Sequence, residues 1–349
     1  MLKRTSLLFA ATLALGVSVQ AQAQSSTITG AGATFPYPVY SQWADDYQDE
    51  SGVGLNYQAI GSGGGIRQIT AGTVTFGASD APLSAEQQER DGLVQFPMIM
   101  GGVVPVINAD IPAGELKLDG ETLAAIYLGE IQRWNDERIA ALNPELELPD
   151  TRITPVYRSD GSGTNFLFTH YLSQVSEEFA NTVGEGNSVA WPSGVGAQAN
   201  GGVAAQVGNV RGAIGYVEYA YAKQNDLNAV QLENSDGQYV APSAESFAAA
   251  AANADWANSP GFALVLTNQP GEQSWPITGV SYILMHKQAS NAAASRSALE
   301  FFDWAYANGE AAANALDYVS MPDNVVELVK TNVWSQIEAD GQPVWTGAE

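Results

Sequence analysis

Short apolar stretches alternate with helical stretches along the chain from Ser26 onward. Residues 53–60 and 153–157 are typical of strands, and apolar side chains recur at helical spacing between Pro36 and Gly52. Strands that alternate with helices usually join a parallel sheet. The alternation therefore predicts an α/β protein with largely parallel sheets flanked by helices, and 349 residues suggest two domains.

The same patterns predict several further elements. Ser84 and Gln87 form a capping box at the start of a helix. Residues 74–76 are expected to form a strand, and helices are expected over residues 165–172, 298–306, 325–337 and in the alanine-rich run 248–254. Two apolar stretches, residues 101–107 and 280–285, are candidates for strands that cross between two lobes. Two such crossings would suit hinge closure.

The first two dozen residues have the features of a secretory signal peptide. Lys3 and Arg4 precede an apolar run over residues 7–19, and Ala21 and Ala23 provide a small-residue cleavage site. A membrane anchor is the alternative, but the run is shorter than the roughly 20 apolar residues that span a bilayer. We therefore expect residues 1–23 to be removed and the mature protein to reach the periplasm or the cell exterior.

Acidic side chains far outnumber basic ones, with 38 Asp and Glu against 14 Lys and Arg, so the formal net charge is −24. Because binding a polyanion needs clustered Lys and Arg, nucleic acid is excluded as a partner. The chain has no cysteine, which excludes disulfides, thiolate nucleophiles and cysteine metal sites. With only His170 and His286 and no EF-hand loop, we expect no metal site and no cofactor, and only a magnesium site built from carboxylates stays open.

Three glycine-rich loops that carry hydroxyl side chains lie where helices are about to begin. They are residues 30–35 (GAGATF), 61–65 (GSGGG) and 160–164 (DGSGT). Free N–H groups at a helix start bind anions, and glycine lets the backbone approach a ligand closely. Each loop alone is most simply a turn, but three together favour an anion site. No loop contains the lysine of a P-loop or the third glycine of a dinucleotide fingerprint.

Two charged residues beside these loops indicate which anion is bound. Arg158 stands two residues before Asp160, and its guanidinium offers forked donors that match a tetrahedral oxyanion. An ordinary surface ion pair with Asp160 is the alternative. Asp80 would repel an anion unless that anion brings a proton to donate. Phosphate carries such a proton near neutral pH, whereas sulfate does not.

Five segments resemble the periplasmic phosphate-binding proteins of high-affinity phosphate ABC transporters. They lie in order along nearly the whole mature chain and read TGAGATFP (29–36), YQAIGSGGG (57–65), FGASDAPLS (76–84), RSDGSGT (158–164) and GAIGYVEYA (212–220). The resemblance implies a type II periplasmic binding protein with two lobes, a mostly parallel sheet in each lobe and a two-strand hinge. It places residues 24–104 and 280–349 in lobe I, which holds both termini, and residues 105–279 in lobe II.

The resemblance also implies a set of phosphate-binding residues. Asp80 would accept the phosphate proton, Arg158 would supply the cationic fork and Asp160 would hold Arg158 in place. Hydroxyl groups and backbone N–H groups around the ion would come from Ala33, Thr34, Phe35, Ser62, Ser162, Gly163 and Thr164. Gly63 departs from the family pattern, in which a second serine is common, and this bears on affinity or loop stiffness.

The resemblance implies partners and an activity as well. It predicts that the protein is a monomeric, non-enzymatic receptor that captures inorganic phosphate between its lobes. The receptor would deliver phosphate to the permease subunits of an ABC transporter in the inner membrane.

A secreted hydrolase that uses a loop serine is the competing hypothesis. The G-x-S-x-G motif of a nucleophile elbow is absent around Ser62, Ser79 and Ser162. A general base is also scarce, because His170 falls in the helix after an anion loop and His286 ends an apolar strand. The residues therefore favour binding over catalysis.

Overall fold

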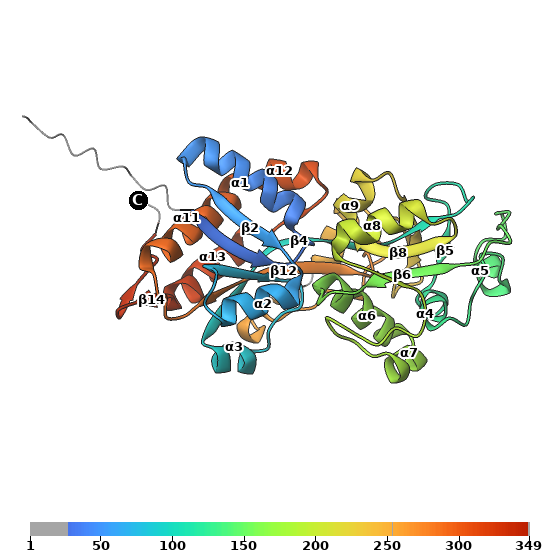
Figure 1. Cartoon of the computed structure of the whole chain (residues 1–349), viewed down its shortest axis with the longest axis horizontal. Coiled ribbons are helices and arrows are strands. Elements are labelled where there is room, and N and C mark those ends of the chain that lie inside the picture. Colours follow the sequence, from blue (N-terminus) through green and yellow to red (C-terminus); the bar gives the residue numbers. More distant parts are fainter. Residues whose placement is uncertain (1–26, 253, 348–349) are drawn as a thin grey trace, which may run out of the picture.

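The computed structural model describes residues 27–252 and 254–347 and shows two α/β halves joined by long strands (Figure 1). The main sheet follows the order β2-β1-β3-β12-β4-β8-β6-β7, and β9 and β13 also pair with β4. Its two longest strands are β4 (Leu93–Asn108) and β12 (Thr278–His286). The other strands of this sheet are β1 (Ile28–Gly32), β2 (Leu55–Ala59), β3 (Phe76–Ser79), β6 (Thr154–Arg158), β7 (Val195–Ala197), β8 (Ala213–Glu218), β9 (Asn228–Ala229) and β13 (Val319–Ser320).

Each half contains one group of three parallel strands. These groups are β2-β1-β3 and β8-β6-β7, whereas β4 and β12 run antiparallel to their neighbours. The described chain also has two small sheets, formed by β5 (Lys117–Leu118), β10 (Gln231–Glu233) and β11 (Tyr239–Val240), and by β14 (Glu338–Ala339) and β15 (Gln342–Pro343). The predicted α/β class with mostly parallel strands in each half is confirmed, and within the main sheet every antiparallel pairing involves β4 or β12.

The helices flank the strands of each half (Figure 1). In the half that contains β1–β3, they are α1 (Tyr37–Ser51), α2 (Ser62–Thr70), α3 (Ala85–Asp91), α11 (Ala292–Asn308), α12 (Glu310–Ala315) and α13 (Asp323–Asn332). In the half that contains β6–β8, they are α4 (Gly120–Leu128), α5 (Glu137–Leu142), α6 (Gly163–Val175), α7 (Glu177–Thr182), α8 (Ala199–Asn209) and α9 (Tyr219–Gln224). The helix α10 (Ala244–Ala251) and the 3-10 turns η1 (Pro260–Phe262) and η2 (Trp334–Gln336) complete the set.

Most of the predicted elements are present, with shifts at their ends. The helix predicted from Pro36 to Gly52 is α1, which ends at a left-handed Gly52, and the capping box of Ser84 and Gln87 starts α3. The strand predicted over residues 74–76 lies later, at Phe76–Ser79, because the glycine and alanine of this segment pair with β1 in the centre of the sheet. The helix predicted to run to residue 337 ends at Asn332 and continues as the short turn η2.

The strand β4 belongs to both halves of the molecule. Its residues Leu93 to Gly102 pair with β12, and its residues Val103 to Asn108 pair with β8. Every residue of β4 except the last is buried, which accounts for its continuous apolar sequence. The lobe boundaries at residues 104 and 280 stay a prediction, and the predicted signal peptide, residues 1–23, lies outside the described residues.

Close packing at the crossing of β4 requires a glycine. A Cβ atom at Gly102 would lie 2.1 Å from the ring of Phe247, a fully buried residue of α10. Nearby, the indole Nε1 of Trp275 donates to the carbonyl oxygen of Val103 over 2.9 Å. The apolar cores of the two halves therefore meet at β4 without room for an added methyl group. Among residues 27–252 and 254–347, no helix is long and apolar enough to cross a membrane.

We predict that Gly102→Ala lowers the free energy of unfolding by about 1–3 kcal/mol, because overpacking forces neighbouring groups from their positions. Gly208→Ala in the exposed last turn of α8 is the matched control, and it should stabilise the protein by about 0.5 kcal/mol. Urea unfolding monitored by tryptophan fluorescence measures both changes. Equal stability of the two variants would contradict the tight packing of Gly102 against Phe247.

Candidate functional site

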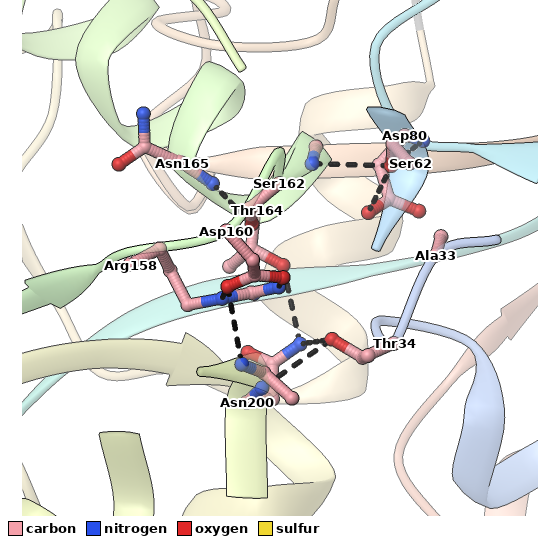
Figure 2. A network of polar contacts seen from close by, with 12 residues as sticks. Ala33, Thr34, Ser62, Asp80, Arg158, Asp160, Ser162, Thr164, Asn165 and Asn200 are labelled. Carbon is pink, nitrogen blue, oxygen red and sulfur yellow. Dashed lines mark hydrogen bonds and ion pairs between the residues drawn. The ribbon is translucent and has the colours of Figure 1, made fainter. Parts of the chain in front are cut away.

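The three glycine-rich loops meet between the two halves of the molecule (Figure 2). Residues 33–35 connect the end of β1 to α1, Gly61 caps α2, and Ser162 caps α6. Gly61 has a φ of 83°, and a Cβ there would lie 2.6 Å from the carbonyl oxygen of Gly161 in the opposite loop. The glycine at this position therefore permits both the backbone turn and the close approach of two loops.

Backbone N–H groups in these loops are left without acceptors. Among the described residues, no hydrogen-bond acceptor is present for the N–H groups of Thr34, Phe35, Ser62 and Thr164. All four residues are buried, with at most 3% of their surface exposed. Since buried N–H groups are nearly always paired, these donors are suited to a bound anion.

Arg158 and Asp160 form a buried, forked ion pair. Nε and Nη2 of Arg158 donate to the two carboxylate oxygens of Asp160 over 2.8 and 2.7 Å, and 1% of the arginine side chain is exposed. Burial opposes ionisation of Asp160, but the hydrogen bonds and charge of Arg158 hold its pKa below the usual value. The pair is therefore not the surface ion pair that the sequence left open. The Nη1 atom of Arg158 is buried and has no acceptor among the described residues.

Asp80 is a buried acid at the end of β3. Its Oδ1 accepts a hydrogen bond from the Ser281 hydroxyl over 2.9 Å, and its Oδ2 lies 3.5 Å from the Ser62 hydroxyl. Burial raises the pKa of Asp80 to about 7, because these hydrogen bonds and the positive charge of Arg158 offset only part of the desolvation. Near neutral pH both the protonated and the ionised form of this side chain are therefore populated, so it can either donate or accept a proton.

Hydrogen bonds connect the loops across the two halves. The hydroxyl of Ser62 accepts from the N–H of Gly163 over 3.1 Å, and the N–H of Gly63 donates to the carbonyl of Gly161 over 2.9 Å. A Cβ at Gly63 would lie 3.3 Å from Cα of Gly161, so a serine there would crowd this contact. The departure from the family pattern at Gly63 therefore coincides with a close interloop approach.

Asn200 is a site residue that the sequence did not reveal. Its Nδ2 donates to the hydroxyl oxygens of Thr34 over 2.8 Å and of Thr164 over 3.2 Å, so it joins the two halves. Its own N–H also donates to the Thr34 hydroxyl over 3.3 Å, and therefore Thr34 must turn its proton elsewhere. The signal was present, since Asn200 begins a helix within a fourth glycine-rich stretch, residues 196–202.

Ser281 is the second residue that sequence reasoning missed. It is fully buried in β12 and donates to Asp80. A single serine within the apolar run of residues 280–285 was the available signal, because a buried hydroxyl needs a partner.

The predicted site residues lie close together, but they differ in whether they have a hydrogen-bond donor that is free to bind a ligand. Ala33 has no free donor, because its N–H is bonded to the carbonyl of Ala78 and its carbonyl accepts from Tyr57. Gly163 uses its N–H on Ser62, and a Cβ there would lie 2.4 Å from the Ser62 hydroxyl oxygen. Ser162 caps α6 through its oxygen and keeps its hydroxyl proton available.

The histidines lie outside this site. Nδ1 of His170 is 2.7 Å from the Thr267 hydroxyl, and Nε2 of His286 is 2.7 Å from the carbonyl oxygen of Ile69. Among the described residues, no group of three or more His, Asp or Glu side chains could hold a metal ion. The site thus combines one buried cation, one poised acid and several N–H and O–H donors, which suits a tetrahedral oxyanion that carries a proton.

Comparison with known proteins defines the class of this fold and site. Residues 18–308 match the model of the PBP superfamily domain. The phosphate-binding protein of Stenotrophomonas maltophilia has a similar structure, with a TM-score of 0.65 at 20% identity over 91% of this chain and 97% of that chain. A high-affinity periplasmic phosphate-binding protein solved with phosphate gives a TM-score of 0.69 at 21% identity, over 90% of this chain and 96% of that chain. The protein is a member of this binding-protein superfamily.

Curated relatives narrow the assignment. The phosphate-binding protein PstS of Pasteurella multocida is 51% identical over 314 residues, which cover 89% of this chain and 91% of the relative. PstS of Haemophilus influenzae is 53% identical over 299 residues, covering 85% of this chain and 90% of the relative. The chain belongs to the PstS family of phosphate-binding proteins, and these relatives bear the names of binding proteins and not of enzymes.

We predict that Asp80→Asn stabilises the ligand-free protein at high pH. The folded-state pKa of Asp80, about 7, lies above its ordinary value of 3.8, so stability that is present below pH 4 is lost as the pH rises through 7. At pH 8 the variant should gain about 4 kcal/mol, because about three pKa units at about 1.4 kcal/mol each separate the two states, with little gain at pH 4. Thermal unfolding in phosphate-free buffer tests this, with the exposed Asp45→Asn as the control. The same gain at both pH values would contradict it.

Proposed function

We propose that this protein captures inorganic phosphate between its two halves and delivers it to the permease of an ABC transporter. One observation carries the proposal most strongly. The buried Arg158 guanidinium and four unpaired N–H groups converge with an acid, Asp80, whose pKa of about 7 suits a ligand that can share a proton. A site for a fully ionised anion would not need this acid.

The roles follow from the donors that each residue has free. Nη1 of Arg158 and the N–H groups of Thr34, Phe35, Ser62 and Thr164 would donate to phosphate oxygens. The hydroxyls of Thr34 and Thr164 would donate as well, because Asn200 occupies their acceptor positions. Ser162 would donate through its hydroxyl, Asp160 would hold Arg158, and Gly163 and Ala33 would shape the backbone around the ion.

Asp80 would provide selectivity against sulfate. In its ionised form the carboxylate accepts the proton of hydrogen phosphate, and Ser281 holds one of its oxygens in place. Sulfate carries no proton, so it would bring an oxygen lone pair against a buried carboxylate. Such a repulsive element excludes a competitor of the same shape far more strongly than a missing contact would.

The wider function rests on the two-half architecture. We propose that residues 24–104 and 280–349 form lobe I and residues 105–279 form lobe II, and that they close on phosphate about β4 and β12. The closed form would act as a monomer in the periplasm, after removal of residues 1–23, and would dock on the permease subunits. The interhalf bonds of Ser62 and Asn200 support closure, since each joins residues from both lobes.

We predict that calorimetric titration of the protein with phosphate gives one-to-one binding and that sulfate at pH 8 gives no response. Asp80→Asn should reduce the phosphate-to-sulfate affinity ratio at least 100-fold, because the amide can donate to sulfate. For the unsubstituted protein, sulfate affinity should rise as the pH falls from 8 to 5, since Asp80 then becomes protonated. An unchanged affinity ratio in the variant would refute the proton-acceptor role of Asp80.

We predict that Arg158→Lys weakens phosphate binding by about 100-fold, equivalent to about 3 kcal/mol, because an ammonium group cannot bond Asp160 and phosphate in the same fork. Arg133→Lys is the matched control, because Arg133 forms an exposed ion pair with Asp150 at 2.7 Å. The phosphate affinity of the control should stay within twofold of the starting value. Equal affinities of the two variants would remove Arg158 from the proposed site.

A further inference from the structure

Three consecutive carbonyl groups next to the proposed site each accept a hydrogen bond from a tyrosine. Tyr57 donates to the carbonyl oxygen of Ala33 over 2.7 Å, Tyr221 to that of Thr34 over 2.7 Å, and Tyr318 to that of Phe35 over 2.6 Å. The tyrosines come from β2, from α9 and from the segment before β13. Three distant parts of the chain thus hold one loop of three residues.

This arrangement bears on the donors of the loop because a peptide group is planar. Fixing the carbonyl of Ala33 fixes the N–H of Thr34, and fixing the carbonyl of Thr34 fixes the N–H of Phe35. Both N–H groups lack an acceptor among the described residues. The carbonyl of Phe35 differs, because its peptide group ends at Pro36, which has no N–H.

The tyrosine hydroxyls act as donors in all three bonds, because a carbonyl oxygen can only accept. Burial raises the pKa values of Tyr57, Tyr221 and Tyr318 above the ordinary value, so the hydroxyls keep their protons. Tyr318 gives a further constraint, since its hydroxyl also lies 2.7 Å from Oε2 of Glu218. The single proton of the Tyr318 hydroxyl is therefore shared between the carbonyl oxygen of Phe35 and the carboxyl group of Glu218.

Glu218 is a buried acid in contact with Tyr318. It is fully buried, Oε2 accepts from the N–H of Ala220 over 3.0 Å, and Oε1 has no partner among the described residues. Burial raises its pKa well above the ordinary value, and the negative charge of Asp80 adds to this effect.

We propose that Tyr57 and Tyr221 are positioning residues for phosphate binding, which aim the N–H groups of Thr34 and Phe35 at the ion by holding the carbonyls of Ala33 and Thr34. Each bond also draws electron density from its carbonyl, which makes the attached N–H a stronger donor. Tyr318 holds a carbonyl with no N–H on the same peptide group, so it anchors the loop without aiming a donor. The inference rests on the proposed phosphate function.

The two positioning residues act at different stages of binding. Tyr57 belongs to the same half of the molecule as Ala33, and its bond does not depend on closure. Tyr221 lies in α9 of the other half and reaches Thr34 across the site. The Tyr221 bond therefore exists only when the halves are closed, and it ties closure to the orientation of the Phe35 N–H.

The test compares Tyr57→Phe, Tyr221→Phe and Tyr318→Phe, each of which removes one hydroxyl from the same loop. Inorganic phosphate is the probe, in calorimetry and in stopped-flow measurements of association and dissociation. We expect about tenfold weaker binding for the first two variants and less than threefold for Tyr318→Phe. The loss in Tyr221→Phe should appear mainly as faster dissociation, because its bond is made only in the closed form.

Amide resonances separate positioning from general destabilisation. In ¹H–¹⁵N spectra of the protein with and without phosphate, Tyr57→Phe should shift the Thr34 amide in both states. Tyr221→Phe should shift the Phe35 amide in the phosphate-bound state alone. Equal affinity losses in all three variants, or unchanged Thr34 and Phe35 resonances, would overturn the inference.

The same experiment distinguishes this inference from the proposed function. Lack of phosphate binding by the unsubstituted protein would refute the function. A shifted Thr34 resonance in ligand-free Tyr57→Phe would still support the orientation of that N–H, and an unshifted one would refute it.

Discussion

The ion pair of the buried Arg158 guanidinium with Asp160 is the interaction on which the proposed anion site depends. A desolvated charge is costly unless it is paired and hydrogen-bonded, and Asp160 satisfies two of its nitrogens with forked geometry. Asp160 in turn accepts from the N–H of Ala199 at the start of α8. The backbone of Arg158 is held by Tyr216 of β8, whose hydroxyl donates to Asn165 of α6. Hydrogen bonds thus connect Arg158 and Asp160 to α8, to β8 and, through Tyr216, to α6.

In the proposed function Asp80 makes the site selective, and its burial also makes the ligand-free protein less stable. The charge of Arg158 favours ionisation of Asp80, but desolvation is the larger effect and keeps the pKa of the acid near 7. A hydrophobic or amide side chain would be easier to bury there. Stability would favour a neutral side chain at this position, whereas sharing a proton with the ligand requires an acid. A buried acid that destabilises the ligand-free protein at neutral pH is therefore expected if it shares a proton with the ligand.

Local patterns in the sequence predicted much of the fold and of the site. Proline at the start of α1 and the capping box of α3 are signals that depend on neighbouring residues alone. Arg158, Asp80 and the glycine-rich loops were predicted as site residues, because this combination of residue types is uncommon in one chain. The shift of β3 to Phe76–Ser79 was not predictable in this way, because glycine and alanine have low strand propensity and are held in the sheet by β1 and β12.

The residues that sequence reasoning missed share one property, which is that long-range contacts define their roles. Asn200 is separated from Thr34 by 166 positions and Ser281 from Asp80 by 201 positions. The tyrosines that hold residues 33–35 are separated from them by 24 to 283 positions. Nothing in a local window shows where such a side chain points. Recognising them requires knowing which segments the fold brings together.

The strong negative charge of the chain shows that the proposed site works by local interactions. A formal charge of −24 opposes the approach of an anion over distances up to the Debye length, about 8 Å at physiological ionic strength. Within the site, the ion would instead contact N–H dipoles, hydroxyls and one guanidinium that are shielded from water, where each interaction is stronger than in solvent. The overall field therefore bears mainly on the rate of encounter, whereas the buried donors determine how long the ion stays. Because the donors are held by tyrosines, by Asn200 and by Asp160, we expect the time that the ion stays bound to depend on contacts from several parts of the chain and not on the surface charge.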